Sequence, residues 1–351
     1  MNPPSRHDPP RRPRQAGAIH KRFLGEGLIR MSEQLHLPRI VDVGARFGVH
    51  PSLRCYENIA EFHLIEPDPD EAARLTELYK AAAEHIQVHS LALSDQPGEL
   101  TLKLRRHGAL SSFYDFNAPL FGDMGYMTRE IECVREVAVK VDTLDDMFAD
   151  RPIDVLKLDT EGAEHDILRG AADQLRQHVL ILRCEVTFSN VFPGRPRFGD
   201  IDRLVCENGF QLLNLDYDGR GVARSPFSLA QRFGQLLSTD ATWIRSDAQL
   251  FDSINADTPR QILVMAHYLF CNHATDVAVW LLAQGIERCL PGIALRRETE
   301  LGVAIRHDMA KLIKDLSYVP GNRHVELMEI YSKLFDEKFP PIYEFYHHFP
   351  L

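Results

Sequence analysis

The sequence contains no apolar run that approaches the ~20 residues needed to cross a bilayer as a helix. Its first 30 residues also lack the apolar segment of a secretory signal peptide and carry prolines and arginines instead. We therefore expect no transmembrane segment and a cytoplasmic location. At 351 residues the chain is long enough for about two domains.

Basic residues are too few to suggest a nucleic-acid partner. The 40 lysines and arginines are outnumbered by 50 aspartates and glutamates, and the formal net charge is -10. Binding to a phosphate backbone depends on clustered positive charge. We expect a small-molecule or glycan substrate instead, and no nucleic acid.

Cysteine is also scarce. The six cysteines are scattered, and no two of them form a C-x-x-C pair. Cysteines without such spacing are more often buried reduced thiols than zinc ligands, so the sequence predicts no metal site built on them. They are Cys55, Cys133, Cys184, Cys206, Cys271 and Cys289.

Composition divides the chain into three parts. Residues 1–30 are rich in proline and arginine, which predicts a disordered basic tail because such a segment buries little apolar surface. Residues 31–247 alternate between strand-like and helix-like patterns. Residues 248–351 contain helix-spaced apolar residues without strands, which predicts a helical C-terminal module, and they end in an aromatic tail. Helices are expected there at 258–282, 297–316 and 325–335.

The middle part predicts an α/β fold. Short apolar runs typical of buried strands alternate with segments whose apolar residues recur every three or four positions. This alternation predicts a doubly wound, mostly parallel sheet with helices on both faces, which binds its ligand beyond the carboxyl ends of the strands. We expect strands at 39–43, 62–66, 86–93, 100–104, 155–159, 179–185, 210–215 and 241–244, and helices at 70–85, 164–175 and 200–208.

A tight turn follows the first expected strand, with the sequence Asp42-Val43-Gly44-Ala45-Arg46-Phe47-Gly48. A dinucleotide-binding turn reads G-x-G-x-x-G, and its middle glycine lets the backbone approach a pyrophosphate. Arg46 stands at that middle position, where its side chain would crowd a pyrophosphate. S-adenosylmethionine has no phosphate, and Asp42 suits its ammonium group, so the turn favours this cofactor over a nicotinamide nucleotide.

Glu66 closes the second expected strand, 18 residues after Gly48. A carboxylate at this position can accept hydrogen bonds from both ribose hydroxyls of an adenosine. A nicotinamide enzyme uses such a residue as well, so Glu66 predicts a nucleoside without deciding which. The segment from Ser90 to Asp95, at the end of the third expected strand, suits the edge of an adenine ring.

The fourth expected strand ends in an acidic segment, Lys157-Leu158-Asp159-Thr160-Glu161-Gly162-Ala163-Glu164. Carboxylates crowded at the carboxyl end of a strand are costly unless they contact a cationic or hydroxylic group. This crowding predicts a functional site. Glu164 also suits the first turn of the helix that follows, because of the helix dipole.

In these motifs the chain resembles the FkbM family of S-adenosylmethionine-dependent methyltransferases. The resemblance rests on D-V-G-A-x-x-G from Asp42, I-E-P from Ile65, V-D-T-L-D from Val141 and K-L-D-T-E-G-A-E-H-D-I-L-R-G-A from Lys157, and it covers roughly residues 38–190. It implies a class I methyltransferase fold, which is Rossmann-like, and methyl transfer to hydroxyl oxygens of saccharides, glycolipids or natural products.

The resemblance also implies which residues hold the cofactor. A serine-containing segment of the family matches Ser111-Ser112, although a serine pair that caps a loop would have the same sequence. The expected cofactor residues are Asp42, Gly44, Ala45, Gly48, Glu66, Pro67, Ser90, Ala92, Leu93 and Ser112.

For catalysis we expect Asp159, Glu161 and Glu185 to surround the transferred methyl group, because Asp159 and Glu185 end neighbouring strands. Asp159 either takes the proton of the acceptor hydroxyl or joins Glu185 in holding a divalent cation. His165 is an alternative base, although its position in the helix favours packing or solvent. Two other functions stay open: a nicotinamide-dependent oxidoreductase, and a non-catalytic scaffold that retains the fold.

Overall fold

The computed structural model describes residues 37–57, 59–124, 127–216, 236–289 and 328–332, which form two compact units. An α/β unit contains residues 37–51 and the described part of 60–253. A helical unit contains the described residues of 52–59 and those from 254 onward. The predicted basic tail, the helix predicted at 297–316 and the aromatic tail lie outside the described residues.

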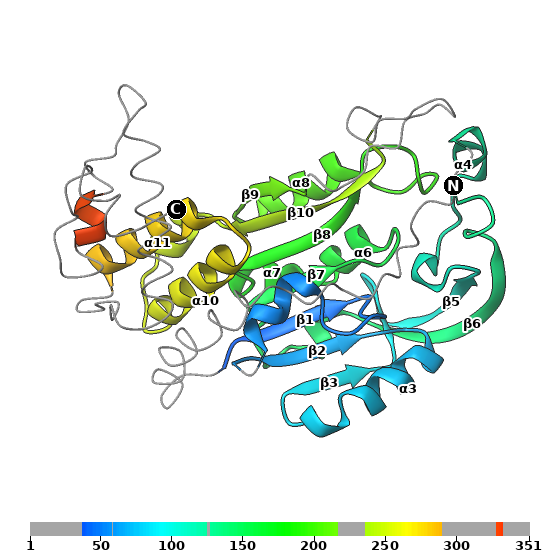
Figure 1. The fold of residues 1–351 in the computed structure, drawn as a ribbon, viewed down its shortest axis with the longest axis horizontal. Helices are drawn as coiled ribbons and strands as arrows, with labels where there is room; N and C mark the ends of the chain where they lie inside the picture. The colour runs from blue at the N-terminus through cyan, green and yellow to red at the C-terminus, as the bar shows by residue number, and fades with distance from the viewer. Residues whose placement is uncertain (1–36, 58, 125–126, 217–235, 290–327, 333–351) are drawn as a thin grey trace, which may run out of the picture. The chain divides into compact units, whose positions relative to one another are not determined.

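The α/β unit is built on a seven-stranded sheet (Figure 1). The strands lie in the order β3-β2-β1-β7-β8-β10-β9. Strand β10 runs in the direction opposite to the other six. The strand order reverses beside β1, so the carboxyl ends of β1 and β7 form the switch point where such sheets bind ligands. The strands are β1 (Arg39–Val43), β2 (Glu61–Ile65), β3 (Ile86–His89), β7 (Val155–Leu158), β8 (Ile181–Thr187), β9 (Phe210–Leu215) and β10 (Ser238–Arg245).

A second sheet has three strands in the order β4-β6-β5, namely β4 (Ala92–Leu93), β5 (Gly98–Arg105) and β6 (Cys133–Asp142). The single strand predicted over 86–93 is therefore wrong. The chain leaves the large sheet after His89, and Ala92 and Leu93 pair with β6 instead. The sequence does not predict β6, because most of its side chains are exposed and it has no continuous apolar run.

Helices α6 (Glu164–Arg169), α7 (Ala172–Gln177) and α8 (Phe198–Glu207) cover one face of the large sheet. Val43, Leu158 and Leu182, from three adjacent strands, belong to one buried cluster with Leu175 and Val205 of these helices. The helix predicted at 164–175 is two helices separated at Gly170. A Cβ atom at Gly170 would lie 2.1 Å from the carbonyl oxygen of Ser94, so the close approach admits only glycine.

The other helices of the α/β unit are short. The helix predicted at 70–85 ends at Leu78, and a turn of 3-10 helix, η2 (Lys80–Ala82), follows. This helix is α3 (Pro69–Leu78), and Asp68 caps its start by accepting a hydrogen bond from the backbone N–H of Asp70. The loop-rich stretch before β6 holds η3 (Gly108–Leu110) and α4 (Ala118–Met124). The full set is completed by α5 (Leu144–Met147) and α9 (Asp247–Phe251).

The helical unit contains α10 (Thr258–Cys271), α11 (Thr275–Arg288), the helical residues 328–332 and most of η1 (Pro51–Tyr56). The continuous helix predicted at 258–282 breaks after α10, where His273 has a φ of 64°. The hydroxyl of Tyr56 in η1 donates a hydrogen bond to the carbonyl oxygen of Val264 in α10 over 2.7 Å. None of the helices in the described ranges is both long and apolar enough to span a membrane.

Candidate active site

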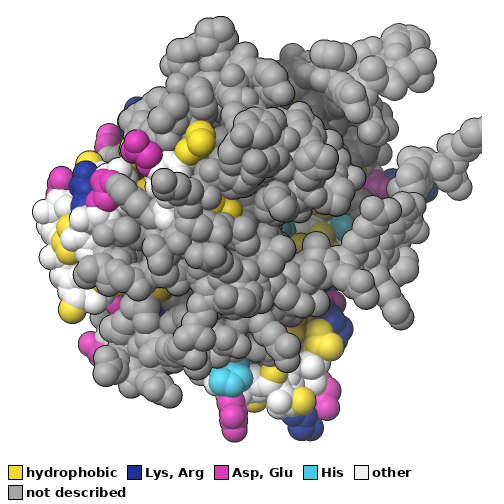
Figure 2. All heavy atoms as spheres, turned by 60° about the vertical axis from the view of Figure 1, so that its left-hand side comes forward, with side chains coloured by type: hydrophobic (Ala, Val, Ile, Leu, Met, Phe, Trp, Pro, Cys, Tyr) yellow, Lys and Arg dark blue, Asp and Glu magenta, His cyan; other side chains and the backbone are white. Residues whose placement is uncertain are grey.

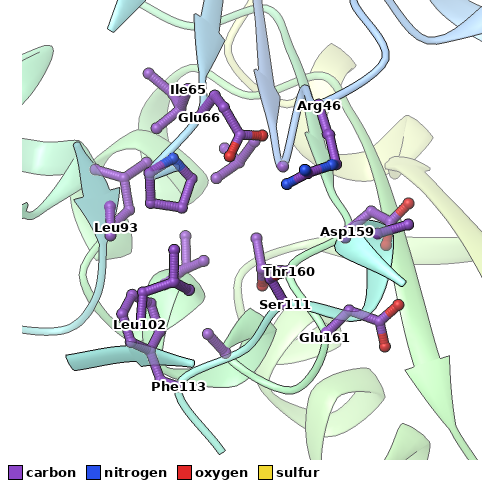
Figure 3. A pocket seen from close by; sticks show the side chains of 18 residues that line it. Arg46, Ile65, Glu66, Leu93, Leu102, Ser111, Phe113, Asp159, Thr160 and Glu161 are labelled. Carbon is purple, nitrogen blue, oxygen red and sulfur yellow. The ribbon is translucent and has the colours of Figure 1, made fainter. Parts of the chain in front are cut away.

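A pocket opens at the carboxyl ends of β1, β2 and β7 (Figure 3). It contains about 560 Å³ of space, part of which is open to solvent. Glu66 and Arg46 lie at one end, and Asp159 and Glu161 lie on one side. The opposite side is apolar and is formed by Leu93, Leu102 and Phe113.

The pocket brings together about half of the site residues expected from the sequence. Those that line it are Gly44, Glu66, Pro67, Ala92, Leu93, Asp159 and Glu161. Those that do not line it are Asp42, Ala45, Gly48, Ser90, Ser112 and Glu185. Ser90 is exposed and Ala45 is buried.

Asp42 lies beneath the pocket as part of a buried ion pair. Its carboxylate lies 3.1 Å from Nζ of Lys157, its neighbour across the β1–β7 pairing, and accepts a hydrogen bond from the backbone N–H of His50 over 2.9 Å. Nζ of Lys157 also lies 3.6 Å from Asp159. In the structure Asp42 pairs with the ammonium group of Lys157, which also lies beside Asp159, and the expected contact of Asp42 with the ammonium group of the cofactor stays a prediction.

Lys157 is fully enclosed, and burial alone would lower its pKa. The carboxylates of Asp42 and Asp159 outweigh this and raise the pKa of Lys157 well above its ordinary value, so the ammonium stays charged. The sequence motif contains Lys157, but its pattern gives no sign of this role, because the partner Asp42 lies on another strand.

Two glycines of the first turn have positive φ angles, which only glycine adopts freely. Gly44 has a φ of 77°, and a Cβ atom there would lie 1.8 Å from the carbonyl oxygen of Asp159. Gly48 has a φ of 83°, and a Cβ atom there would lie 2.3 Å from the hydroxyl of Tyr79. The two glycines therefore let the turn pack against β7 and α3.

Glu66 is almost fully buried at the end of the pocket and accepts a hydrogen bond from the backbone N–H of Asp68 over 2.9 Å. Burial raises the pKa of Glu66 to about 7, against the opposing effects of that N–H group and of Arg46. Arg46 forms ion pairs with Asp68 at 3.0 Å and with Glu71 at 3.3 Å. The sequence indicates only that Arg46 would block a pyrophosphate, whereas the structure makes it part of the pocket wall.

The turn that carries Glu161 adopts an unusual backbone conformation. Glu161 has a φ of 56° and Gly162 a φ of 107°. The buried carboxylate of Glu164 accepts hydrogen bonds from the backbone N–H of Thr160 over 2.8 Å and from that of Gly162 over 3.0 Å. Glu164 therefore shapes this turn directly, beyond the helix-dipole role that its position in the sequence suggests. A non-glycine residue with a positive φ is a strained feature common at functional sites.

Ser112 supports the same turn from behind. Its hydroxyl donates a hydrogen bond to the carbonyl oxygen of Glu161 over 2.6 Å, and its side chain is buried. The neighbouring Ser111 lines the pocket instead. Ser112 therefore supports the backbone of Glu161, and its expected contact with the cofactor stays a prediction.

Glu185 lies on β8 directly beside Asp159, because the parallel register pairs Leu158 with Cys184. Carboxylate oxygens of Asp159, Glu161 and Glu185 all lie within 4.8 Å of one another. Burial, followed by the charges of Glu161 and Asp159, raises the pKa of Glu185 well above its ordinary value. The three residues expected for catalysis therefore form one cluster, although Glu185 lies at its edge and does not line the pocket.

His165 stands apart from this cluster. Its Nδ1 lies 3.9 Å from Asp166, it does not line the pocket, and burial lowers its pKa. Asp159 and Glu161 line the pocket, so they are better placed than His165 to accept a proton there.

The sequence matches the family model described as the methyltransferase FkbM domain over residues 42–212, and a search of curated proteins gave no match. One similar solved structure is methyltransferase FkbM from Methylobacillus flagellatus KT, at 18% identity and a TM-score of 0.34, covering 64% of this chain and 48% of that one. Another is magnesium protoporphyrin IX methyltransferase from Synechocystis PCC 6803 with bound S-adenosylmethionine, at 10% identity and a TM-score of 0.30, covering 64% and 76%.

This chain spans about half the length of the Methylobacillus protein. The family match includes the turn after β1, Glu66 and the acidic segment after β7, which build the pocket. It confirms the resemblance carried by the motifs: residues 42–212 of the chain are a methyltransferase FkbM domain.

Proposed function

We propose that the α/β unit transfers the methyl group of S-adenosylmethionine to a hydroxyl oxygen of a saccharide-type acceptor. The observation that carries this proposal is the cluster of Asp159, Glu161 and Glu185 beside a pocket whose far end holds Glu66. Such a site binds a cationic cofactor at its acidic side and a ribose at its other end. It also holds a group that can take a proton.

The polarity of the pocket fits one orientation of the cofactor. Glu66 accepts hydrogen bonds from the ribose hydroxyls, and the apolar side around Leu93, Leu102 and Phe113 receives the adenine ring. The sulfonium then faces Asp159 and Glu161, whose negative charge attracts it. In this orientation the methyl group points toward the carboxylate cluster.

The reaction is a direct displacement. The acceptor oxygen forms a bond to the methyl carbon as the bond from that carbon to sulfur breaks, and S-adenosylhomocysteine leaves with the electron pair. The hydroxyl proton passes to a carboxylate of the cluster. A carboxylate with a raised pKa is a stronger base than an ordinary one, so Glu185 is suited to receive it. A divalent cation held by the same oxygens is the alternative.

A second pocket supports a saccharide acceptor. Its lining combines residues whose side chains form hydrogen bonds with an aromatic residue and two aliphatic ones: Asn117, Asp123, Ser189, Asn190, Arg197, Phe188, Pro119 and Leu120. Phe188 follows Glu185 by three residues, so their Cα atoms are at most about 10 Å apart. Polar groups around an aromatic face suit a sugar ring, whose hydroxyls form hydrogen bonds and whose C–H groups pack on the aromatic face.

Replacing Glu66 with glutamine should weaken S-adenosylmethionine binding roughly 10- to 1,000-fold, because two hydrogen bonds from ribose to a charged group are weakened. In the parent, the cofactor binds the ionised form of Glu66, whose pKa is about 7 in the protein. Protonation below that pKa opposes binding, so the affinity at pH 6 should be about tenfold weaker than at pH 8. Calorimetry at both pH values measures each effect.

The Glu66→Gln variant is the control for the pH profile, since titration of the cofactor itself affects parent and variant alike. Equal slopes in parent and variant would remove Glu66 from cofactor binding. Folded protein is verified in each case by circular dichroism.

Replacing Asp123 with asparagine should raise KM for the acceptor roughly 10- to 100-fold, because one hydrogen bond to a charged group is lost. The affinity for S-adenosylmethionine should stay unchanged, since Asp123 lines the second pocket and not the first. Asp252→Asn, an exposed position outside both pockets, is the matched control. Steady-state rates at varied acceptor concentration separate the two constants, and an unchanged KM would remove this pocket from the acceptor site.

The proposed function is tested by methyl transfer from labelled S-adenosylmethionine to a panel of oligosaccharides and to RNA. The net charge of -10 favours the saccharides. Figure 2 shows both acidic and basic side chains among the described residues visible on one face. Transfer to RNA alone would overturn the acceptor class. The absence of transfer to any acceptor would favour the scaffold, and binding of NAD in place of S-adenosylhomocysteine would favour the oxidoreductase.

A further inference from the structure

Two cysteines and a histidine come together in the helical unit, and none of the three takes part in the proposed reaction. Cys55 lies on η1, and His267 and Cys271 lie one turn apart on α10. One ligand atom from each of the three residues lies within 4.8 Å of the other two. His267 is almost fully buried, whereas Cys55 and Cys271 are half-buried.

The ligand atoms lie close to, and slightly beyond, the separations of a tetrahedral zinc site. With Zn–S bonds of about 2.3 Å and Zn–N bonds of about 2.0–2.1 Å, a tetrahedron has S···N edges of about 3.6 Å and S···S edges of about 3.8 Å. Nε2 of His267 lies 4.0 Å from Sγ of Cys271. Small rotations of the side chains would bring this pair to the required distance without moving α10.

We propose that the helical unit binds a zinc ion through the thiolates of Cys55 and Cys271 and Nε2 of His267. The donor set selects the metal, because two thiolates and an imidazole favour zinc over Mg²⁺ and Ca²⁺, which take oxygen ligands. This zinc site takes no part in the proposed methyl transfer and is independent of it.

Zinc binding would release the thiol protons of both cysteines and break one hydrogen bond of His267. Each cysteine thiol loses its proton to solvent as its sulfur coordinates the ion. Nε2 of His267 lies 2.8 Å from the carbonyl oxygen of Cys55, a hydrogen bond that coordinated Nε2 would give up. The ion then replaces this link between η1 and α10 with bonds from both elements to one atom.

The bonds to zinc would add to the contacts that hold η1 against α10. Besides the bonds to zinc, η1 is held to α10 by the hydroxyl of Tyr56 on Val264 and by the side-chain amide of Asn272 on the carbonyl oxygen of Ser52. Zinc adds to these a connection between segments more than 200 residues apart in sequence. Closing so long a loop stabilises the fold by restricting the unfolded chain.

The experiment titrates the reduced full-length chain with Co²⁺, a spectroscopic probe for zinc sites. Binding should give the thiolate-to-metal charge-transfer absorption and the visible bands of tetrahedral Co²⁺, and Zn²⁺ should displace both. Cys55→Ser and Cys271→Ser should each weaken Co²⁺ binding by at least ~100-fold, since even the loss of a residue that only forms a hydrogen bond with a metal ligand costs 10- to 100-fold. Cys206→Ser, an exposed cysteine in α8, should behave as the parent.

Retained S-adenosylmethionine binding checks that each variant is folded, and the metal readout does not depend on methyl transfer. The proposal is overturned if the parent shows no charge-transfer absorption, or if the spectrum persists in the Cys55→Ser/Cys271→Ser double variant. It is also overturned if the two cysteines form a disulfide and the protein takes up no Co²⁺ after reduction.

Discussion

Replacing Glu185 with glutamine should lower kcat roughly 10²- to 10⁴-fold, the usual contribution of a positioned general base. Affinity for S-adenosylmethionine should change little, because Glu185 lies beside the pocket lining and not in it. Asp159→Asn should also lower kcat, since Asp159 lies next to Glu185 and lines the pocket. Single-turnover methyl transfer at saturating cofactor measures the chemical step, and calorimetry measures cofactor affinity.

The pH profile distinguishes a base from a residue that only shapes the site. Because the pKa of Glu185 is raised by burial and by neighbouring carboxylates, the parent should gain activity as pH rises and the carboxyl group ionises. Glu185→Gln should lose this limb of the profile. Glu207→Gln, an exposed glutamate at the end of α8, is the control and should keep the parent rate.

The same assay tests the divalent cation. EDTA should leave the parent rate unchanged if the carboxylates act as a base. A rate that EDTA abolishes and Mg²⁺ restores would assign Asp159 and Glu185 to metal binding instead. Parent rates in both Glu185→Gln and Asp159→Asn would move the catalytic centre away from this cluster.

The parts of the fold that the sequence predicts are those in which a local pattern decides the outcome. The strand expected at Arg39–Val43 and the one at Phe210–Leu215 have the observed bounds, because apolar residues mark both. Glu66 is predicted at a strand end and lies at the pocket for the same local reason. The expected fold class, a doubly wound and mostly parallel sheet, is confirmed because it follows from the order of these elements.

The parts that the sequence does not predict depend on contacts between distant residues. The pairing of Lys157 with Asp42 joins two strands, and the support of Glu161 by Ser112 joins residues 49 apart. Each residue stands in a visible motif, but a motif does not say which way a side chain points. His267 and Cys271 are four residues apart, a spacing at which helical side chains are neighbours, whereas their third partner could not be found without the fold.

Replacing Gly44 with alanine should lower the free energy of unfolding by roughly 2–6 kcal/mol, from backbone strain at a positive φ and from overpacking. The added Cβ would lie 1.8 Å from the carbonyl oxygen of Asp159, a backbone atom that cannot turn aside. Binding of S-adenosylmethionine should fall below detection. Gly98→Ala is the control, because a Cβ there meets no heavy atom within 4 Å, and its stability should stay within about 0.5 kcal/mol of the parent. Urea unfolding and calorimetry measure the two effects.

The reason to expect both effects from one methyl group is that Gly44, in the turn after β1, packs against the backbone of Asp159 at the end of β7. The backbone N–H groups of Gly44 and Ala45 donate hydrogen bonds to the carbonyl oxygen of Ile65, and that of Asp159 donates to Val43. To relieve the contact, either the turn must leave β2 or Asp159 must leave β1. The first change displaces the wall beside Glu66, and the second displaces Asp159, the carboxylate that we propose lies beside the methyl group. A Gly44→Ala protein with parent stability and parent cofactor affinity would therefore contradict the packing on which this site is built.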